Sequence, residues 1–300
     1  MYLTETIRTD MISRRITGTT DMPSYDELRT TGADILKRAG IADAALDALL
    51  LLEHITGLDR NGLLLHGRED VPADKENKYL ELIDRRAGHV PLQHITCHQE
   101  FMGLDFAVNE HVLVPRQDTE CLVEEAMLYT EDGMKVLDVC TGSGCIIISL
   151  AKYKNGLEAV GCDISGEALE VADDNAKNNG VDVSFALSDL YEAVDDRFDV
   201  IVSNPPYIRT GVIEGLMEEV RDHEPRIALD GGEDGLDFYR RLIDGADDHL
   251  ISGGMLLLEI GFDQGADVSR LMEEHGYKDV TVVKDLAGND RVVRGRRPIL

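Results

Sequence analysis

The stretch KVLDVCTGSGC, residues 135–145, decides the fold of this 300-residue chain. It combines a strand, a turn that contains two glycines, and the start of a helix. In an open α/β sheet, ligands bind beside the first such turn, at the carboxyl ends of the strands. The stretch lacks the third glycine of a dinucleotide fingerprint and the lysine of a phosphate-binding loop. It therefore predicts an α/β domain with a ligand site at the turn, but it does not identify the ligand.

From residue 135 onward, the pattern alternates between strands and single helices. Strands are expected at 135–139, 157–162, 181–186, 198–203 and 255–260, and helices at 143–152, 165–178, 236–250 and 264–275. Strands joined by single helices pair in parallel through right-handed crossovers. The chain closes with a predicted hairpin at 280–283 and 290–294, which indicates an antiparallel strand at or near one edge of the sheet.

The chain before this alternation divides into three predicted parts. Residues 1–22 are polar and show no clear period, which predicts a flexible arm. Residues 23–89 have the pattern of a helical domain, and residues 90–114 alternate between short apolar runs and turns, as a β-hairpin linker does. We assign residues 115–300 to the α/β domain.

Capping signals place the helices of the N-terminal part. Ser24 and Glu27 have the spacing of a capping box, and Gly57 ends an almost wholly apolar helix that begins at Ala44. Further helices are expected near 59–65 and 72–87. A helix is also expected at 119–130, with Asp118 or Thr119 as its cap.

Composition excludes several classes of partner. The formal net charge is −28 and the isoelectric point is about 4.5. Such a surface repels phosphates and anionic lipids, so we expect neither a nucleic acid nor a membrane as partner. No apolar run approaches the roughly 18 residues of a membrane span. The first residues lack the apolar core of a secretory signal, which favours a cytoplasmic protein.

The cysteine content also favours a cytoplasmic protein. There are five of them, an odd number, and no CxxC pair is present. These features argue against a disulfide framework and against a structural zinc site. We therefore expect a reducing compartment and no metal.

Acidic residues follow the next two predicted strands. Asp163 comes about 20 residues after the glycines, where an acid accepts hydrogen bonds from ribose hydroxyls. Ser165 is available to cap the following helix, which leaves Asp163 for a ligand. Asp189 and Leu190 follow the third strand and are placed to flank an adenine, one as acceptor and one as apolar wall. An ordinary loop acid is the alternative for Asp189.

The fourth strand ends in Asn204-Pro205-Pro206-Tyr207, within the segment VIVSNPPYI. A planar amide or aromatic amino nitrogen is a poor nucleophile because its lone pair is delocalised. Two fixed acceptors for its N–H groups let the lone pair face an electrophile, and the Asn204 side-chain oxygen and the Pro205 carbonyl can be those acceptors. The prolines hold the carbonyl rigidly, and Tyr207 can cover the planar group. This tip predicts catalysis by positioning and hydrogen bonding.

Together these features resemble a class I S-adenosylmethionine-dependent methyltransferase. The resemblance implies a Rossmann-like sheet of seven strands, parallel except for one antiparallel strand, with a small helical bundle joined to it by the hairpin. The cofactor would be S-adenosylmethionine, with S-adenosylhomocysteine as product. The implied cofactor-binding residues are Asp138, Cys140, Thr141, Gly142, Ser143, Gly144, Asp163, Asp189, Leu190 and Asn204. Asp138 matches an acid with which the family orients the turn and the methionine end of the cofactor.

The NPPY segment is shared by methyltransferases of three substrate classes: DNA adenine amino groups, RNA guanine amino groups and protein glutamine amides. The acidic charge argues against nucleic acid. The predicted sheet uses the residues after Tyr207, which leaves no room for a DNA-recognition domain. An amino-methyltransferase that acts on a nucleobase remains the alternative, and a cofactor-binding scaffold without catalysis is a third hypothesis.

Further segments resemble the peptide chain release factor glutamine methyltransferases, the PrmC/HemK family. They are RRAG at 85–88, VPLQHI at 90–95, FMGLDF at 101–106, VLVPRQDTE at 112–120, HEPRIALDGGEDGL at 223–236, LEIG at 258–261 and DLAGNDR at 285–291. The resemblance covers about residues 24–297. Three positions depart from it: Cys140 stands where many members carry glycine, Gln117 where proline is frequent, and Leu190 where some members carry tryptophan.

The resemblance implies methylation of the side-chain nitrogen N5 of the glutamine in the Gly-Gly-Gln loop of class-1 peptide chain release factors. The implied catalytic and substrate-binding residues are Asn204, Pro205, Pro206 and Tyr207. The helical N-terminal domain would then help to hold the release factor. We expect the enzyme to act as a monomer.

Overall fold

The computed structural model describes residues 22–299. The chain divides after Thr96 into two compact units. The predicted flexible arm, residues 1–22, lies outside the described residues except for Met22, which is exposed. No helix in the described part of the chain is both long and apolar enough to cross a membrane.

The N-terminal unit is helical from Tyr25 onward. Its helices are α2 (Tyr25–Arg38), α3 (Ala44–Thr56), α4 (Arg60–His66), α5 (Ala73–Ala87) and α6 (Leu92–Thr96). The predicted capping box is confirmed, because the Ser24 hydroxyl accepts from the Glu27 N–H and the Glu27 carboxylate accepts from the Ser24 N–H. Gly57 ends α3 with φ of 70°, in the left-handed region, as the sequence indicated.

Helix α3 is the centre of this unit, as its apolar surface predicts. It contacts α2, α4, α5 and α6. The Tyr79 hydroxyl of α5 donates to the Ala48 carbonyl of α3 at 2.9 Å. Arg86 Nε donates to the buried Asp47 carboxylate at 2.7 Å. A charged pair inside the apolar core therefore holds α5 in register against α3.

The predicted hairpin linker is only partly a hairpin. Strands β1 (His98–Phe101) and β2 (Leu104–Ala107) pair antiparallel around Met102 and Gly103, both with positive φ. Residues 92–96 instead form α6, because Leu92 and Ile95 stand three apart and pack on one face against the helical core. Phe101 and Phe106 belong to the core of the C-terminal unit.

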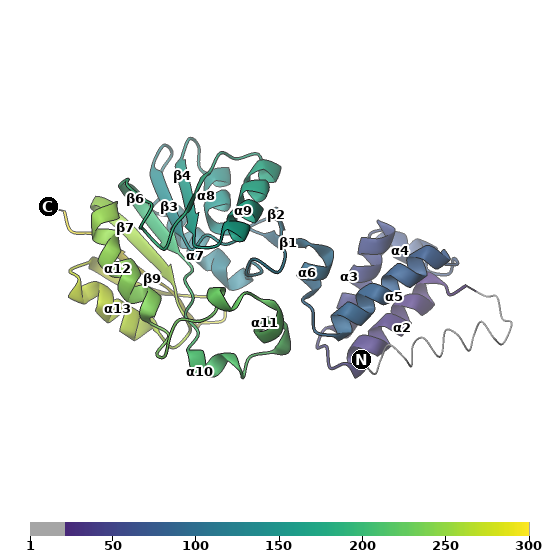
Figure 1. Cartoon of the computed structure of the whole chain (residues 1–300). Helices are drawn as coiled ribbons and strands as arrows, with labels where there is room; N and C mark the ends of the chain where they lie inside the picture. Colours follow the sequence, from purple (N-terminus) through teal and green to yellow (C-terminus); the bar gives the residue numbers. More distant parts are fainter. Residues whose placement is uncertain (1–21, 300) are drawn as a thin grey trace. The chain divides into compact units, whose positions relative to one another are not determined.

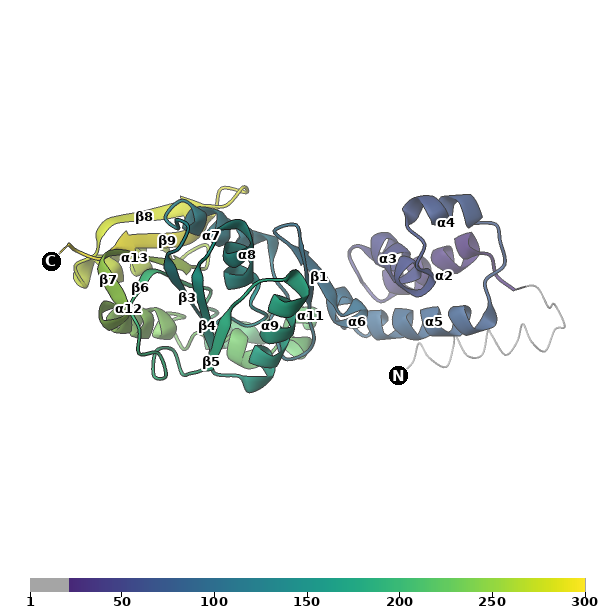
Figure 2. The same ribbon diagram turned by 90° about the horizontal axis from the view of Figure 1, so that it is seen from above.

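The C-terminal unit is built on a seven-stranded sheet with the order β5-β4-β3-β6-β7-β9-β8. Its strands are β3 (Lys135–Val139), β4 (Glu158–Asp163), β5 (Ser184–Leu187), β6 (Phe198–Ser203), β7 (Leu250–Glu259), β8 (Lys278–Lys284) and β9 (Asp290–Arg296). Strand β9 runs antiparallel to the other six strands of this sheet, and β8 and β9 lie at the edge drawn in yellow (Figure 2). The predicted fold class is confirmed.

Helices cover both faces of this sheet (Figure 1). They are α7 (Gln117–Met127), α8 (Cys145–Tyr153) and α9 (Gly166–Asn179) on one face, and α12 (Asp237–His249) and α13 (Gly265–Glu274) on the other. Alternate residues of each central strand enter the two cores: Val200 and Val202 face α7 and α8, while Ile201 faces α12. Apolar residues on both faces make the strands near-continuous apolar runs.

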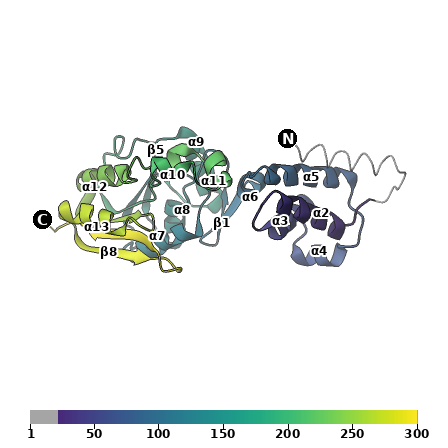
Figure 3. The same ribbon diagram turned by 90° about the horizontal axis from the view of Figure 1, so that it is seen from below.

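Chain order places a crevice at the carboxyl edge of the sheet. The chain passes from β3 outward to β4 and β5, then returns to β6 on the other side of β3. Ligands bind outside the carboxyl ends of the strands at the point where the strand order reverses in this way. After β6 come α10 (Thr210–Ile213), α11 (Glu218–His223) and the 3₁₀ turn η1 (Arg226–Ala228). Helices α10 and α11 lie next to each other in Figure 3.

Several elements differ from their predicted bounds by a few residues, and two of the differences have identifiable reasons. Helix α7 begins at Gln117 without a side-chain cap. The proposed caps have tertiary partners instead: Asp118 pairs with Arg291, and Thr119 contacts Asn204. Strand β7 starts five residues earlier than expected, because glycines at 253–254 interrupt its apolar pattern beside an irregularity in the β6–β7 pairing.

Candidate active site

A pocket opens at the carboxyl edge, where β3 and β6 lie side by side. Its volume is about 1070 Å³, counted out to its open mouth. Nine residues expected at the site line it: Cys140, Thr141, Gly142, Ser143, Asp163, Asp189, Leu190, Asn204 and Pro206. Four others lie behind or beside it without lining it: Asp138, Gly144, Pro205 and Tyr207.

The turn after β3 is held in a conformation that suits glycine. Cys140, Gly142 and Gly144 have φ of 61°, 54° and 79°. Nothing lies within 4 Å of the point where a Cβ on Gly142 would stand, so this position leaves room for a ligand. A Cβ on Gly144 would instead meet the Ile148 side chain at 2.7 Å. We expected both glycines to admit a ligand, but Gly144 serves the packing of α8.

Replacing Gly144 with alanine is expected to destabilise the α/β unit by about 1–3 kcal/mol, because it combines a left-handed φ with a steric clash. Urea unfolding followed by circular dichroism measures this change. Gly133→Ala is the matched control, since Gly133 has φ of 80° and nothing within 4 Å of its Cβ position. Equal destabilisation by the two substitutions would show that the contact with Ile148 contributes nothing.

Asp163 holds the glycine turn as well as facing the pocket. Its Oδ2 accepts from the Gly142 N–H at 2.9 Å, and its Oδ1 accepts from the Ser165 N–H at 3.0 Å. Burial raises the pKa of Asp163, and these N–H donors oppose that rise. Ser165 caps α9 with its own hydroxyl, as predicted. Each carboxylate oxygen of Asp163 keeps a lone pair for a further donor.

Asp138 lies fully buried behind the turn. The Thr141 hydroxyl donates to its Oδ2 at 2.7 Å, whereas Oδ1 has no hydrogen-bond partner within residues 22–299. Burial raises the pKa of Asp138 to about 7, opposed by the Thr141 hydrogen bond. A buried carboxyl oxygen without a donor is costly and marks a group that is completed by something else.

Asp189 and Leu190 lie at the far end of the pocket. The Asp189 carboxylate pairs with the Arg241 guanidinium at 2.8 Å, and about a third of the Asp189 side chain is exposed. Leu190 is buried, and its φ is 53°. Phe238 lines the same pocket and adds an aromatic surface to the wall that Leu190 forms.

The four residues that follow β6, Asn204 to Tyr207, have different positions relative to the pocket. Asn204 Nδ2 donates to Thr119 Oγ1 at 3.3 Å, while Pro206 lines the pocket and Pro205 is buried beside it. The Tyr207 hydroxyl donates to Glu259 Oε1 at 3.4 Å. Its ring is therefore directed at β7, and a role in covering a substrate stays a prediction. Burial raises the pKa of Tyr207, so the phenol is neutral.

The rim of the pocket is tied together by an ion pair that the sequence did not indicate. Arg116, which lines the pocket, donates to Glu224 at 2.6 Å. The Glu224 side chain is 1% exposed, and burial raises its pKa against the influence of Arg116. The pair joins the segment before α7 to the segment after α11, so the mouth of the pocket has two linked sides.

Sequence reasoning missed several residues that surround the site, namely Thr119, Ile164, Phe238, Arg241 and Glu259. For two of them, the sequence contains a feature that could have indicated a place beside the site. Phe238 is an apolar residue outside the buried stripe of α12, which contains Tyr239, Leu242, Ile243 and Ala246. Ile164 follows Asp163 directly, and its apolar side chain is 51% exposed. The other three occupy positions that look ordinary in their own segments.

Comparisons with known proteins agree with this geometry. Residues 27–96 match the family model described as PrmC N-terminal domain, and residues 117–220 match the Methyltransferase small domain. A methyltransferase of known structure from Pyrococcus furiosus is 22% identical with a TM-score of 0.51, over 66% of this chain and 90% of that chain. That likeness concerns the fold alone.

Curated relatives cover nearly the whole chain. The release factor glutamine methyltransferase of Agrobacterium fabrum is 41% identical over 87% of this chain and 93% of its own length. That of Geobacter sulfurreducens is 43% identical over 87% of this chain and 92% of its own length. With this identity across both units, the chain belongs to the family of release factor glutamine methyltransferases.

Proposed function

We propose that this chain transfers a methyl group from S-adenosylmethionine to the side-chain nitrogen N5 of the glutamine in the Gly-Gly-Gln loop of class-1 peptide chain release factors. One observation carries the proposal. The amide of Asn204 opens onto the same pocket as the glycine turn and Asp163. A donor site and an acceptor site for methyl transfer are thus adjacent.

The residues of the pocket fit the cofactor. Gly142 leaves open space, Asp163 has lone pairs for ribose hydroxyls, and Asp138 has an oxygen without a partner. When bound, the cofactor supplies an electrophilic methyl group on a sulfonium centre. Leu190 and Phe238 would contact the adenine, with Asp189 near its polar edge.

The strand tip would hold the substrate amide by both of its hydrogens. Thr119 Oγ1 occupies the Nδ2 end of the Asn204 amide, so the Oδ1 end is left for the substrate. The Pro205 carbonyl is the second acceptor, and its position is rigid because proline fixes φ. Two fixed acceptors hold the nitrogen with its lone pair toward the methyl group, which is catalysis by positioning.

The charge of the chain supports a protein substrate over a nucleobase. The net charge of −28 disfavours phosphates. We also propose that the helical unit, 23–89, helps to dock the release factor, since Leu64 and Leu65 on α4 expose 73% and 82% of their surface. A cytoplasmic, monomeric enzyme stays our prediction.

Labelled S-adenosylmethionine tests the substrate class. We expect label in a purified class-1 release factor and none in its Gln→Ala loop variant, because the loop glutamine carries the acceptor nitrogen. DNA and RNA are incubated in parallel. Label in nucleic acid and none in release factor would refute the proposal in favour of a nucleobase methyltransferase.

A further inference from the structure

A buried amide lies beside the strand tip, residues 204–207, without lining the pocket. Gln264 directly precedes α13 and is 2% exposed. It stands at the N-cap position of α13, yet within residues 22–299 its side chain makes no capping hydrogen bond to that helix. The side chain instead bonds to segments that meet at the carboxyl edge of the sheet, so it is free to fix their positions.

The hydrogen-bonding capacity of the Gln264 amide is fully used. Its Nε2 donates to the Tyr207 carbonyl at 3.0 Å and to the Gly235 carbonyl at 3.1 Å. Its Oε1 accepts from the Gly261 N–H at 2.8 Å and from the Tyr239 hydroxyl at 3.3 Å. Because carbonyl oxygens can only accept and a backbone N–H can only donate, these partners permit a single orientation of the amide. Gln264 therefore holds the Tyr207 carbonyl in one place.

The strand tip lies so close to the loop before α12 that only glycine fits there. A Cβ on Gly235 would stand 2.5 Å from the Tyr207 carbonyl oxygen and 2.8 Å from Gln264 Nε2. A Cβ on Gly231 would stand 2.7 Å from Tyr207 Cα and 2.9 Å from the Pro206 carbonyl oxygen. The backbone of the tip thus packs directly on this loop, and the Gln264 amide joins the two.

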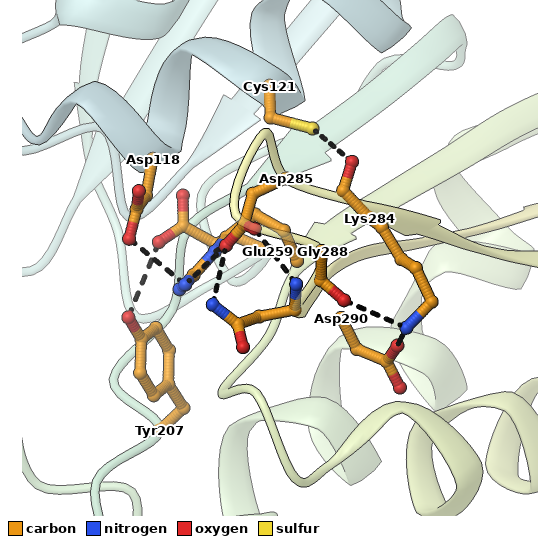
Figure 4. A network of polar contacts seen from close by, with 10 residues as sticks. Asp118, Cys121, Tyr207, Glu259, Lys284, Asp285, Gly288 and Asp290 are labelled. Atoms are coloured by element: carbon orange, nitrogen blue, oxygen red, sulfur yellow. Dashed lines mark hydrogen bonds and ion pairs between the residues drawn. The ribbon is translucent and has the colours of Figure 1, made fainter.

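The side chain of Tyr207 is fixed by the end of β7. Its hydroxyl donates to Glu259 Oε1 at 3.4 Å, and Figure 4 shows the phenol turned toward this carboxyl group. The Tyr239 hydroxyl shares its proton between the Glu259 carbonyl at 2.9 Å and Gln264 Oε1 at 3.3 Å. Gln264 therefore belongs to a buried cluster of hydrogen bonds that holds Tyr207 at both its carbonyl and its hydroxyl.

The other end of the tip is fixed by the sheet. Ser203 is paired in β6, and its hydroxyl donates to the Val139 carbonyl at 2.6 Å. Between Ser203 and Tyr207 stand two prolines, whose rings lock φ. A segment of three residues that is held at both ends and has two dihedral angles locked keeps its carbonyl groups in fixed directions.

We propose that Gln264 is a positioning residue for methyl transfer. By holding the Tyr207 carbonyl, it keeps the Pro205 carbonyl in place as the second acceptor for the substrate amide. The inference rests on the proposed function, which assigns that acceptor role to Pro205. Gln264 itself acts through the backbone of the tip and does not contact the cofactor pocket.

The test compares Gln264→Met with wild type at saturating cofactor and release factor. Methionine has a similar volume and no amide, so the Tyr207 carbonyl loses its donor. We expect kcat to fall about 10- to 100-fold, because a small displacement of a group that orients the substrate has an effect of this size. The cofactor dissociation constant, measured by calorimetric titration, should stay unchanged, since the glycine turn and Asp163 are intact.

Asn179→Leu is the matched control for the loss of a side-chain amide. The Asn179 amide also donates to two backbone carbonyls, those of Asp105 at 2.9 Å and Asn175 at 3.0 Å, and it lies outside the pocket lining. This variant should unfold at a lower urea concentration than wild type and keep the wild-type kcat. The comparison separates positioning of the tip from a general loss of stability.

Gly235→Ala perturbs the same contact while it leaves the Gln264 amide in the protein. The added Cβ pushes against the Tyr207 carbonyl, so kcat should again fall about 10- to 100-fold. Gly133→Ala is its control, because Gly133 has φ of 80°, close to the 75° of Gly235, and nothing within 4 Å of its Cβ position. This pair decides the question if Gln264→Met does not fold, which circular dichroism reveals.

Four outcomes would overturn the inference. They are a folded Gln264→Met enzyme with the wild-type kcat, a loss of cofactor affinity in step with kcat, an equal loss of kcat in Asn179→Leu, and equal kcat values in Gly235→Ala and Gly133→Ala. If wild type itself does not methylate the release factor, the proposed function fails instead, and the two failures are thereby distinguished.

Discussion

Replacing Asn204 with alanine is expected to reduce kcat for methyl transfer by about 10²- to 10³-fold, the usual loss when one fixed hydrogen-bonding group is removed from a reacting centre. In the wild type, Thr119 holds the Nδ2 end of the amide, which leaves Oδ1 as an acceptor for the substrate. Without it, one N–H of the substrate amide has no acceptor. The nitrogen lone pair then stays delocalised and turned away from the methyl group.

Cofactor affinity should change little in the Asn204→Ala enzyme, because the glycine turn and Asp163 are intact. Single-turnover kinetics give the rate, and calorimetric titration gives the affinity. Asn155→Ala is the control: Asn155 is exposed and bonds to Asp132, far from the tip in sequence and outside the pocket lining. An Asn204→Ala enzyme as fast as the Asn155→Ala enzyme would contradict our interpretation of the tip.

Asp163→Ala should weaken cofactor binding by about 30- to 1000-fold, or roughly 2–4 kcal/mol. Two effects combine. The ribose hydroxyls lose a charged acceptor, and the Gly142 N–H loses the carboxylate that holds the turn at 2.9 Å. A hydrogen bond to a charged group contributes more than one between neutral groups. The effect should appear in the dissociation constant of the cofactor, with the release factor affinity unaffected.

Asp189→Ala is the comparison variant for this prediction, because we expect it to lose less cofactor affinity than Asp163→Ala. Asp189 is partly exposed and already paired with Arg241, so its interaction with a ligand is screened and shared. We expect its substitution to weaken cofactor binding by less than about tenfold. If Asp189→Ala costs more affinity than Asp163→Ala, the ribose role assigned to Asp163 is wrong.

The parts of the site that could be predicted from sequence are those set by local backbone geometry. The strand at Lys135–Val139 and the strand at Phe198–Ser203 have the bounds that the apolar pattern predicts. Each ends where a glycine turn or a proline stops it. Parallel strands bring their carboxyl ends to one edge, so Asp163 and Asn204 meet at the pocket although they are 41 positions apart in the sequence.

The unpredicted parts depend on tertiary packing. Thr119 belongs to a helix whose contact with the tip follows from how α7 packs on the sheet, and Glu259 is one position at the end of an apolar strand. No local pattern tells which helix face will turn toward a pocket. Thr119 was predicted as a helix cap because a threonine hydroxyl can accept a hydrogen bond from a nearby backbone N–H. In the folded protein, this hydroxyl instead accepts from the side chain of Asn204.

Short elements without a period were also missed. Helices α10 and α11 and the turn η1 contain four, six and three residues, too few for a helical pattern to emerge. The turn η1 nevertheless supplies part of the pocket lining through Ile227 and Ala228, and Pro225 directly before it lines the pocket too. Their position is fixed by contacts distant in sequence, such as the Arg116–Glu224 pair.

Mass spectrometry of the methylated product tests the central claim most directly. A class-1 release factor is incubated with S-adenosylmethionine and the wild-type enzyme, and the peptide that carries the Gly-Gly-Gln loop is sequenced by fragmentation. Our account predicts a single added methyl group on the side-chain nitrogen of the glutamine, absent when the Asn204→Ala enzyme is used. A methyl group on another residue, or an unmodified loop beside methylated DNA or RNA, would contradict it.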